Sequence, residues 1–291
     1  MKIIINPIGG LANRMRALVS GIALAQKMRA DFRVIWLRNW ELNAKFEDLF
    51  EMPEVLKGKI SYPSKPVYGL CYSVPRKKNL YITSLTWKRF EEAISDNTPR
   101  GQQLLRNADL DNRIEALVSG MSDSGTLFLQ GGIDLYNSYS PDYYRQFFRL
   151  NQEIQQRVDE TCRSLGPNRV GLHIRRTDNE MSVTHSPDIL FEEKIREELG
   201  QNPDTRFYLA SDDQAVKTKF AELFPKSVHV LPETSERGTR EGMQNAAYEL
   251  FVLTNTSKIY GSYYSSFSGT AALLGDIPLQ ELYAGPADIA D

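Results

Sequence analysis

The second half of the chain alternates regularly between short apolar segments and amphipathic segments. This alternation restricts the possible folds more than any other feature of the sequence. Strands that are separated by helices of this length indicate a parallel, doubly wound α/β sheet with helices on both faces. Such sheets bind ligands beyond the carboxyl ends of their strands. The expected strands are residues 169–175, 206–210, 227–231, 258–261 and 279–283, and the expected helices are residues 189–199, 214–224, 242–254 and 268–274.

The first half begins with a second unit of the same kind. Residues 3–5 and 32–37 are expected strands, and the segment between them repeats apolar residues every three or four positions, as a helix does. The middle of the chain is less regular, with strand-like segments at residues 59–62, 80–83 and 126–130.

A long amphipathic helix is expected from Pro141 to Gly166. We predict a domain boundary near it, with an N-terminal Rossmann-like domain at residues 1–150 and a C-terminal Rossmann-like domain at residues 151–291. Two such domains that face each other would place the ligand cleft between them.

Composition excludes several functional classes. Lys and Arg number 35 against 37 Asp and Glu, so the chain has no basic excess of the kind that nucleic-acid binders show. Cys71 and Cys162 lie far apart, which excludes a disulfide framework and favours a reducing compartment. The sequence shows neither a signal-peptide pattern nor about 18 consecutive apolar residues. We therefore predict a cytoplasmic protein with no integral membrane segment and no nucleic-acid partner.

The segment His173-Ile-Arg-Arg-Thr-Asp178 follows an apolar strand and is the strongest functional signal. Adjacent arginines cannot be buried unpaired, and the planar guanidinium is well suited to phosphate. Successive residues of a strand point to opposite faces, so Arg175 and Arg176 can both point at one small anion only if the strand has ended. A purely structural alternative is that one arginine pairs with Asp178 while the other is solvated.

Ser211-Asp212-Asp213 follows the next expected strand. A carboxylate there can accept two N–H groups from the edge of guanine, which adenine does not offer. Alternatively, Asp212 or Asp213 only caps the following helix. The two roles can also be divided between the two residues.

Ser262-Tyr-Tyr-Ser265-Ser266-Phe-Ser268 lies between an expected strand and an apolar helix. Helix N-termini present free N–H groups and partial positive charge, and therefore bind phosphate readily. A serine-rich cap and turn without a ligand is the alternative.

Gly9-Gly10-Leu-Ala-Asn13-Arg14 follows the first expected strand. It lacks the glycine spacing of dinucleotide-binding enzymes and the Gly-Lys-Ser/Thr ending of a P-loop, so both classes are disfavoured. The two glycines could instead allow only a tight turn, with Arg14 and Arg16 solvated.

Taken in order, these motifs resemble the fucosyltransferase superfamily, which includes the α1,2-, α1,6- (nodulation-protein Z type) and protein O-fucosyltransferases. The resemblance implies a GT-B fold and inverting transfer of fucose from GDP-fucose to a glycan acceptor, with neither a metal nor another cofactor. The C-terminal domain would bind the GDP-sugar, and the N-terminal domain would form the acceptor side. Asn179 departs from the pattern, because the α1,6 type has lysine after the aspartate of the arginine motif.

The resemblance also implies roles for individual residues. Arg175 and Arg176 would bind the diphosphate and stabilise the charge on the departing GDP. Asp178, Glu180 and His185 are the candidates for a catalytic base, and a mechanism without a protein base stays open. The residues expected to bind the donor are His173 and Asp212 or Asp213 at the nucleoside, Ser265, Ser266 and Ser268 at the phosphate, and Gly10, Asn13 and Arg14 across the cleft.

Two other functions stay open on the sequence. One is a transferase that uses a different nucleotide sugar, and the other is a catalytically inactive nucleotide-binding module. The expected partners are the nucleotide-sugar donor and the glycan acceptor, with transient contact to a membrane surface.

Overall fold

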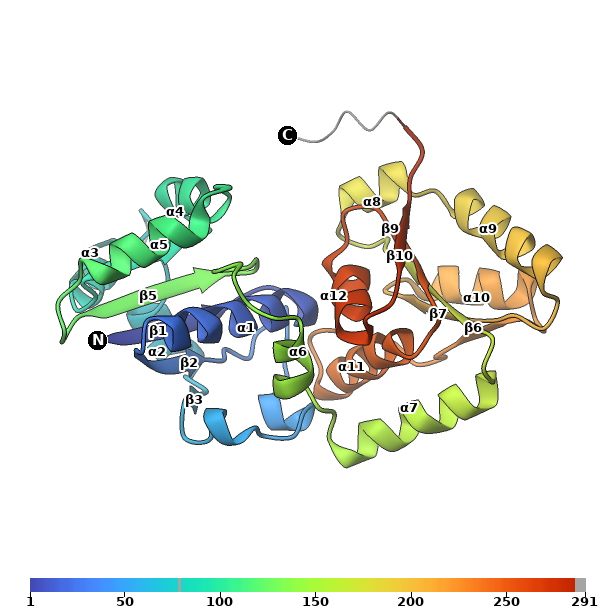
Figure 1. The fold of residues 1–291 in the computed structure, drawn as a ribbon, viewed down its shortest axis with the longest axis horizontal. Coiled ribbons are helices and arrows are strands. Elements are labelled where there is room, and N and C mark those ends of the chain that lie inside the picture. The colour runs from blue at the N-terminus through green and yellow to red at the C-terminus, as the bar shows by residue number, and fades with distance from the viewer. Residues whose placement is uncertain (78–79, 286–291) are drawn as a thin grey trace. The chain divides into compact units, whose positions relative to one another are not determined.

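A computed structural model describes residues 1–77 and 80–285. The chain divides into two compact units, Met1–Arg149 and Leu150–Asp291. Each unit contains a five-stranded parallel sheet with helices packed against it (Figure 1). The expectation of parallel α/β sheets is confirmed.

The C-terminal unit has the strand order β10-β9-β6-β7-β8, and all its neighbouring strands are parallel. The central strand β6 therefore lies between β9 and β7. The strands are β6 (Arg169–Ile174), β7 (Arg206–Ser211), β8 (Val228–Val230), β9 (Ile259–Ser262) and β10 (Leu279–Leu282). The helices are α7 (Gln152–Leu165), α8 (Glu180–His185), α9 (Asp188–Gln201), α10 (Gln214–Leu223), α11 (Arg240–Thr254) and α12 (Ser266–Gly275).

The pleat of β6 divides its side chains between two helical layers. Val170, Leu172 and Ile174 lie in one apolar core with residues of α9 and α10. On the other face, a Cβ atom added to Gly171 would lie 2.9 Å from a methyl group of Leu253, so the absence of a side chain lets α11 approach. His173 lies on that second face, where its ring stacks on Phe267 of α12.

The N-terminal unit has the strand order β3-β2-β1-β5-β4, again with parallel neighbours. The strands are β1 (Lys2–Pro7), β2 (Asp31–Ile35), β3 (Ile60–Ser61), β4 (Glu92–Ser95) and β5 (Thr126–Gly131). The helices are α1 (Leu11–Lys27), α2 (Lys65–Cys71), α3 (Leu80–Trp87), α4 (Pro99–Leu105), α5 (Leu110–Ser119) and α6 (Asp142–Phe147), with short 3₁₀ helices at Phe46–Asp48 and Glu54–Leu56.

Two sequence-based expectations are wrong. The apolar, β-branched segment at residues 80–83 begins helix α3, whereas the edge strand β4 follows it at Glu92–Ser95. The long helix expected from Pro141 is two helices, because Phe148 leaves the helical conformation and Asn151 starts α7. The Asn151 side chain accepts the Ile154 N–H at 3.0 Å, which is an N-cap contact.

Arg14 ties the turn after β1 to the chain that follows β2. The residue is 1% exposed, and its guanidinium donates to the carbonyls of Gly9 and Leu37 at 2.8 and 2.5 Å and to Asn39 Oδ1 at 2.9 Å. Arg16 forms an ion pair with Asp134 at 2.6 Å. The alternative that both arginines are merely solvated is therefore wrong.

We expect Arg14→Lys to lower the free energy of unfolding by at least about 2 kcal/mol. Lysine keeps the charge but cannot reproduce the planar fork, so buried carbonyls lose their donor. Denaturant unfolding measures the change. Arg33→Lys is the control, because Arg33 is exposed and donates to a single carbonyl, Gly58 O, at 3.2 Å; equal losses for the two variants would contradict the role of Arg14.

Candidate functional site

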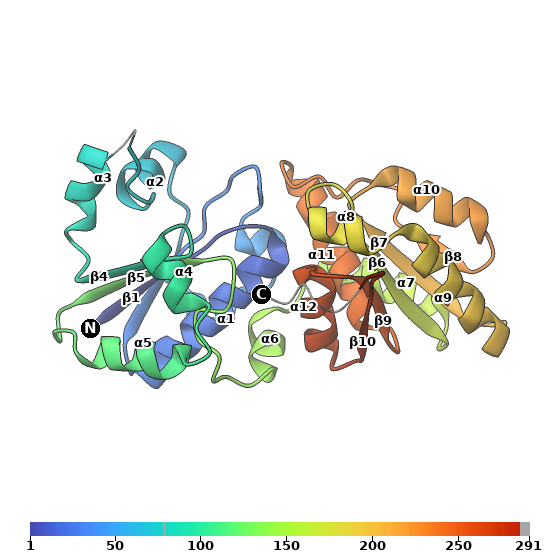
Figure 2. The same cartoon turned by 90° about the horizontal axis from the view of Figure 1, so that it is seen from above.

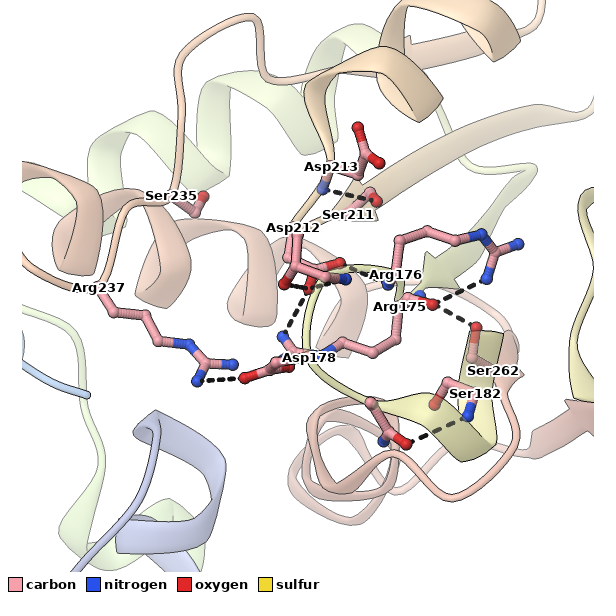
Figure 3. A network of polar contacts seen from close by, with 12 residues as sticks. Arg175, Arg176, Asp178, Ser182, Ser211, Asp212, Asp213, Ser235, Arg237 and Ser262 are labelled. Carbon is pink, nitrogen blue, oxygen red and sulfur yellow. Dashed lines mark hydrogen bonds and ion pairs between the residues drawn. The ribbon is translucent and has the colours of Figure 1, made fainter. Parts of the chain in front are cut away.

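The carboxyl ends of β6, β7 and β9 bring the three C-terminal motifs together. The Arg175 N–H donates to Ser262 Oγ at 3.0 Å, which joins the first and third motifs. The carboxylate of Asp212 accepts the backbone N–H groups of Arg176 and Thr177 at 2.8 and 3.0 Å, which joins the first and second motifs (Figure 3). The chain leaving β6 is thus held from both neighbouring strands.

Arg175 and Arg176 extend to opposite sides of the sheet (Figure 3). Arg175 lies on the side of α11 and α12, where its guanidinium pairs with Asp178 and, at 3.1 Å, with Asp212. Arg176 extends toward α9 and donates to Asp188 and to the carbonyl of Ser186. This is the alternation of a strand continued for two residues. In this conformation one anion can contact only one of the two guanidinium groups, and Arg176 already has protein partners.

Arg237 is a third arginine of this site, and sequence reasoning missed it. Its guanidinium donates to Asp178 Oδ2 at 3.0 Å, so Asp178 bridges Arg237 and Arg175 (Figure 3). Arg237 comes from the loop between β8 and α11, 59 residues away in sequence, and no motif marks it.

A buried ion pair holds that loop. Glu249 of α11 and Lys217 of α10 lie 2.7 Å apart, and their side chains are almost fully buried. Ser235 Oγ donates to the same glutamate at 2.6 Å. Burial raises the pKa of Glu249, while the charge of Lys217 opposes this effect. Ser235 lies two residues before Arg237. Its hydrogen bond to the buried pair therefore anchors to helix α11 the loop that carries Arg237.

Asp212 and Asp213 have different local roles. Asp213 caps α10 by accepting the Ala215 N–H at 2.8 Å, as the structural alternative predicts. Asp212 instead fixes the loop after β6. Burial would raise its pKa, but the charge of Arg175 and the hydrogen bonds from Thr177 and Arg176 lower it below the ordinary value. Asp212 is therefore ionised at neutral pH.

His173 is a neutral, buried imidazole at the end of β6. Its exposed fraction is 3%, and burial together with the charge of Arg175 lowers its pKa to about 3, with Asp212 opposing. Nδ1 is buried without a hydrogen-bond partner among the described residues. Such an atom in a native site calls for an explanation such as a ligand or a water molecule.

The third motif combines a strained turn with a helix start. Tyr264 has a φ of 56°, a left-handed conformation that is uncommon for a bulky residue and frequent at functional sites. Ser265 is the N-cap of α12, Ser266 is its first residue and Ser268 is buried in its first turn. The Ser268 hydroxyl donates to the Ser265 carbonyl at 3.3 Å. The first-turn N–H groups of α12 are therefore presented beside the end of β9.

Helix α8 connects the first motif to the third. Asn179 caps α8 by accepting the Ser182 N–H at 3.1 Å and donates to the Tyr264 carbonyl at 2.9 Å. Glu180 is the first residue of α8 and is exposed, and within the described residues its carboxylate has no hydrogen bond or ion pair. His185 ends α8 with its ring edge-on to Tyr263.

In the N-terminal unit, the glycine turn brings Asn13 close to two backbone segments. Gly9 has a φ of +83°, and a Cβ atom there would lie 3.0 Å from Asn13 Nδ2. A Cβ atom added to Gly132, after β5, would lie 3.5 Å from the same nitrogen. Gly10 is the N-cap of α1. Arg14 is buried as described above, and the contact of Gly10, Asn13 and Arg14 with a donor stays a prediction.

Among residues 1–77 and 80–285, no cluster of three or more His, Cys, Asp or Glu side chains could hold a metal ion. No helix in that part of the chain is both long and apolar enough to cross a membrane.

Solved structures of fucosyltransferases share this fold. The α1,6-fucosyltransferase NodZ, known from Bradyrhizobium, in crystals soaked with GDP-fucose aligns with a TM-score of 0.59 and 18% identity over 96% of this chain and 94% of NodZ. POFUT1 in complex with GDP-fucose aligns with a TM-score of 0.57 and 12% identity over 98% of each chain. No family model and no curated protein sequence matches the chain. At these identities the likeness shows a shared fold alone.

The low pKa of His173 predicts a pH dependence of stability. The folded state holds the imidazole neutral down to about pH 3, whereas the unfolded chain takes up a proton near 6.5. This contribution is therefore fully present above 6.5 and is lost as the pH falls, at up to about 1.4 kcal/mol per pH unit. Unfolding of the wild type and of His173→Gln between pH 7 and about pH 4.5 measures it. We expect a steeper loss in the wild type, and parallel curves would contradict the buried neutral imidazole.

Proposed function

We propose that the protein is an inverting, metal-independent glycosyltransferase that transfers fucose from GDP-fucose to a glycan acceptor. The observation that carries the proposal is the arginine cluster at the carboxyl edge of the C-terminal sheet, in a fold shared with fucosyltransferases that were crystallised with GDP-fucose. Doubly wound sheets bind nucleotides at this edge.

The diphosphate of the donor would lie against Arg175, Arg237 and the N-terminus of α12. Arg175 is 16% exposed and already balanced by two aspartates, so it is held in place before a ligand arrives. A diphosphate can take over the exposed Asp178 side of this network, which frees donors on Arg175 and Arg237. The first-turn N–H groups of α12 add partial positive charge.

Arginine would supply the leaving-group stabilisation that a metal ion gives in other transferases. The bond from the fucose C1 to the β-phosphate oxygen breaks, and negative charge develops on GDP as the acceptor oxygen attacks from the opposite face. Fixed guanidinium groups favour that charge without reorganisation. Arg176 would contribute directly only if it left Asp188, so we assign it first to positioning the loop and second to the diphosphate.

The base that accepts the acceptor proton stays open between Asp178, Glu180, His185 and no protein base. Asp178 is already paired with Arg175 and Arg237, whereas Glu180 is exposed and free of ion pairs within the described residues. Glu180 is therefore the better candidate. A base must reach the acceptor hydroxyl within hydrogen-bond distance, or through one water molecule.

For the nucleoside, we assign His173 rather than Asp213. His173 Nδ1 is a buried acceptor or donor that lacks a partner among the described residues, while the Asp213 carboxylate already caps α10. The Asp212 carboxylate holds the loop after β6 by accepting the backbone N–H groups of Arg176 and Thr177. It could reach guanine only by losing these hydrogen bonds. Gly10, Asn13 and Arg14 of the N-terminal unit are kept as donor-binding candidates, and Ser265, Ser266 and Ser268 as candidates at the phosphate.

Two alternatives use the same arginines. Another nucleotide sugar would bind through the same phosphate contacts, and an inactive module would bind GDP without turnover. A cytoplasmic location, which the two free cysteines favour, fits all three.

Calorimetric titration with GDP and with UDP, first without added metal and then with a chelator, tests the proposal. We expect GDP binding that the chelator leaves unchanged and much weaker UDP binding. Arg175→Ala should weaken GDP binding by about tenfold to a hundredfold, the effect of losing charge-assisted hydrogen bonds. Arg206→Ala is the matched control, because Arg206 is the first residue of β7 and lies at the amino end of the strand, whereas the candidate site lies at the carboxyl end.

Each outcome has a distinct reading. Tight UDP binding would select the other nucleotide sugar, and GDP binding without hydrolysis or transfer of GDP-fucose would select the inactive module. Equal GDP affinity of the Arg175→Ala and wild-type proteins would overturn the assignment of the diphosphate.

A further inference from the structure

Helices α2 and α3 of the N-terminal unit expose apolar side chains and bury almost none. Thr83, a polar residue, is the buried side chain of α3, and none of the seven residues of α2 is buried. On α3, Tyr81 is 86% exposed and Leu85 is 68% exposed. The other exposed apolar side chains of the pair are Val67, Leu70, Leu80 and Ile82.

We call the exposed side chains of this helix pair the α2–α3 surface. Thr86 of α3 donates to the Leu70 carbonyl of α2 at 2.7 Å, and Arg89 donates to the Cys71 carbonyl at 3.0 Å. The two helices therefore lie side by side (Figure 2). Single exposed apolar residues are normal on a protein surface, but a contiguous group of them marks an interaction site.

The same segment has an unusual charge. Residues 64–90 contain six Lys or Arg residues and no Asp or Glu, in a chain whose formal net charge is -2. The rest of the chain is therefore acidic, and the positive charge is concentrated around the apolar residues. Lys65, Arg76, Lys77, Lys88 and Arg89 are exposed, whereas Lys78 lies outside the described residues.

We propose that the α2–α3 surface binds the headgroup region of an anionic membrane. Helices that lie in this region insert apolar side chains a short way and place Lys and Arg against anionic headgroups. Tyr81 is of the type that prefers this interface. Charge decides against a protein partner, because the centres of protein interfaces are depleted in Lys, whereas here Lys65 begins α2 and Lys88 and Arg89 directly follow α3.

Membrane binding does not depend on the donor or on catalysis. Only its consequence rests on the proposed function: a transferase held at the membrane would meet glycan acceptors that are attached to lipids. The surface therefore favours lipid-linked oligosaccharides over soluble glycans as the acceptor class.

Co-sedimentation of the full chain with vesicles tests the proposal. One vesicle type contains phosphatidylcholine alone, and the other contains phosphatidylcholine with phosphatidylglycerol. We expect binding to the anionic vesicles that weakens as salt is added, because salt screens the headgroup charge. Two variants, Lys77→Glu/Lys88→Glu and Tyr81→Ser/Ile82→Ser/Leu85→Ser, should each reduce this binding at least about tenfold.

The control is Leu223→Ser/Lys226→Glu, which removes an exposed apolar side chain and an exposed lysine from the C-terminal unit. It should bind vesicles as the wild type does. Denaturant unfolding of every variant checks that the proteins are folded, and GDP titration separates this proposal from the proposed function. Equal binding of the wild type and either α2–α3 variant, no binding to anionic vesicles, or dimerisation that the apolar variant abolishes would overturn the proposal.

Discussion

The candidate site depends on one carboxylate, that of Asp212. It lies at the end of β7 and accepts two backbone N–H groups from the chain that leaves β6, while pairing with Arg175. These contacts fix the direction in which Arg175 and Arg176 leave the sheet. Ser262 holds the same chain from the other side, so three neighbouring strands determine the position of one guanidinium group. A site that must stabilise developing charge needs this kind of preorganisation.

The two adjacent arginines are not equivalent. The pleat sends Arg175 toward Asp178 and Arg237, where a ligand can compete for partners, and sends Arg176 toward Asp188. Lys219 also pairs with Asp188 at 2.9 Å, so Arg176 belongs to a network of ion pairs within the protein. We infer that Arg175 of this motif contacts the ligand, whereas Arg176 positions the loop. The proposed donor site and the α2–α3 surface are carried by different units of the chain.

Periodicity predicted the C-terminal sheet well, because apolar strands and amphipathic helices alternate there without interruption. It failed at residues 80–83, since apolar residues exposed on a helix look in sequence like a buried strand. The break before Asn151 was missed because the apolar pattern continues through it. The three motifs were correctly expected to follow strands, but Arg237 could not be predicted: its position depends on the buried Lys217–Glu249 pair, whose members are far apart in sequence.

A crystal structure of the complex with GDP would test the central claim most directly. The account predicts the diphosphate within hydrogen-bond distance of the Arg175 guanidinium and of the first-turn N–H groups of α12, with His173 facing the nucleoside. Arg237 would have moved from Asp178 to the phosphate or would share it. A diphosphate bound elsewhere, with the Arg175 pairs to Asp178 and Asp212 intact, would contradict the account.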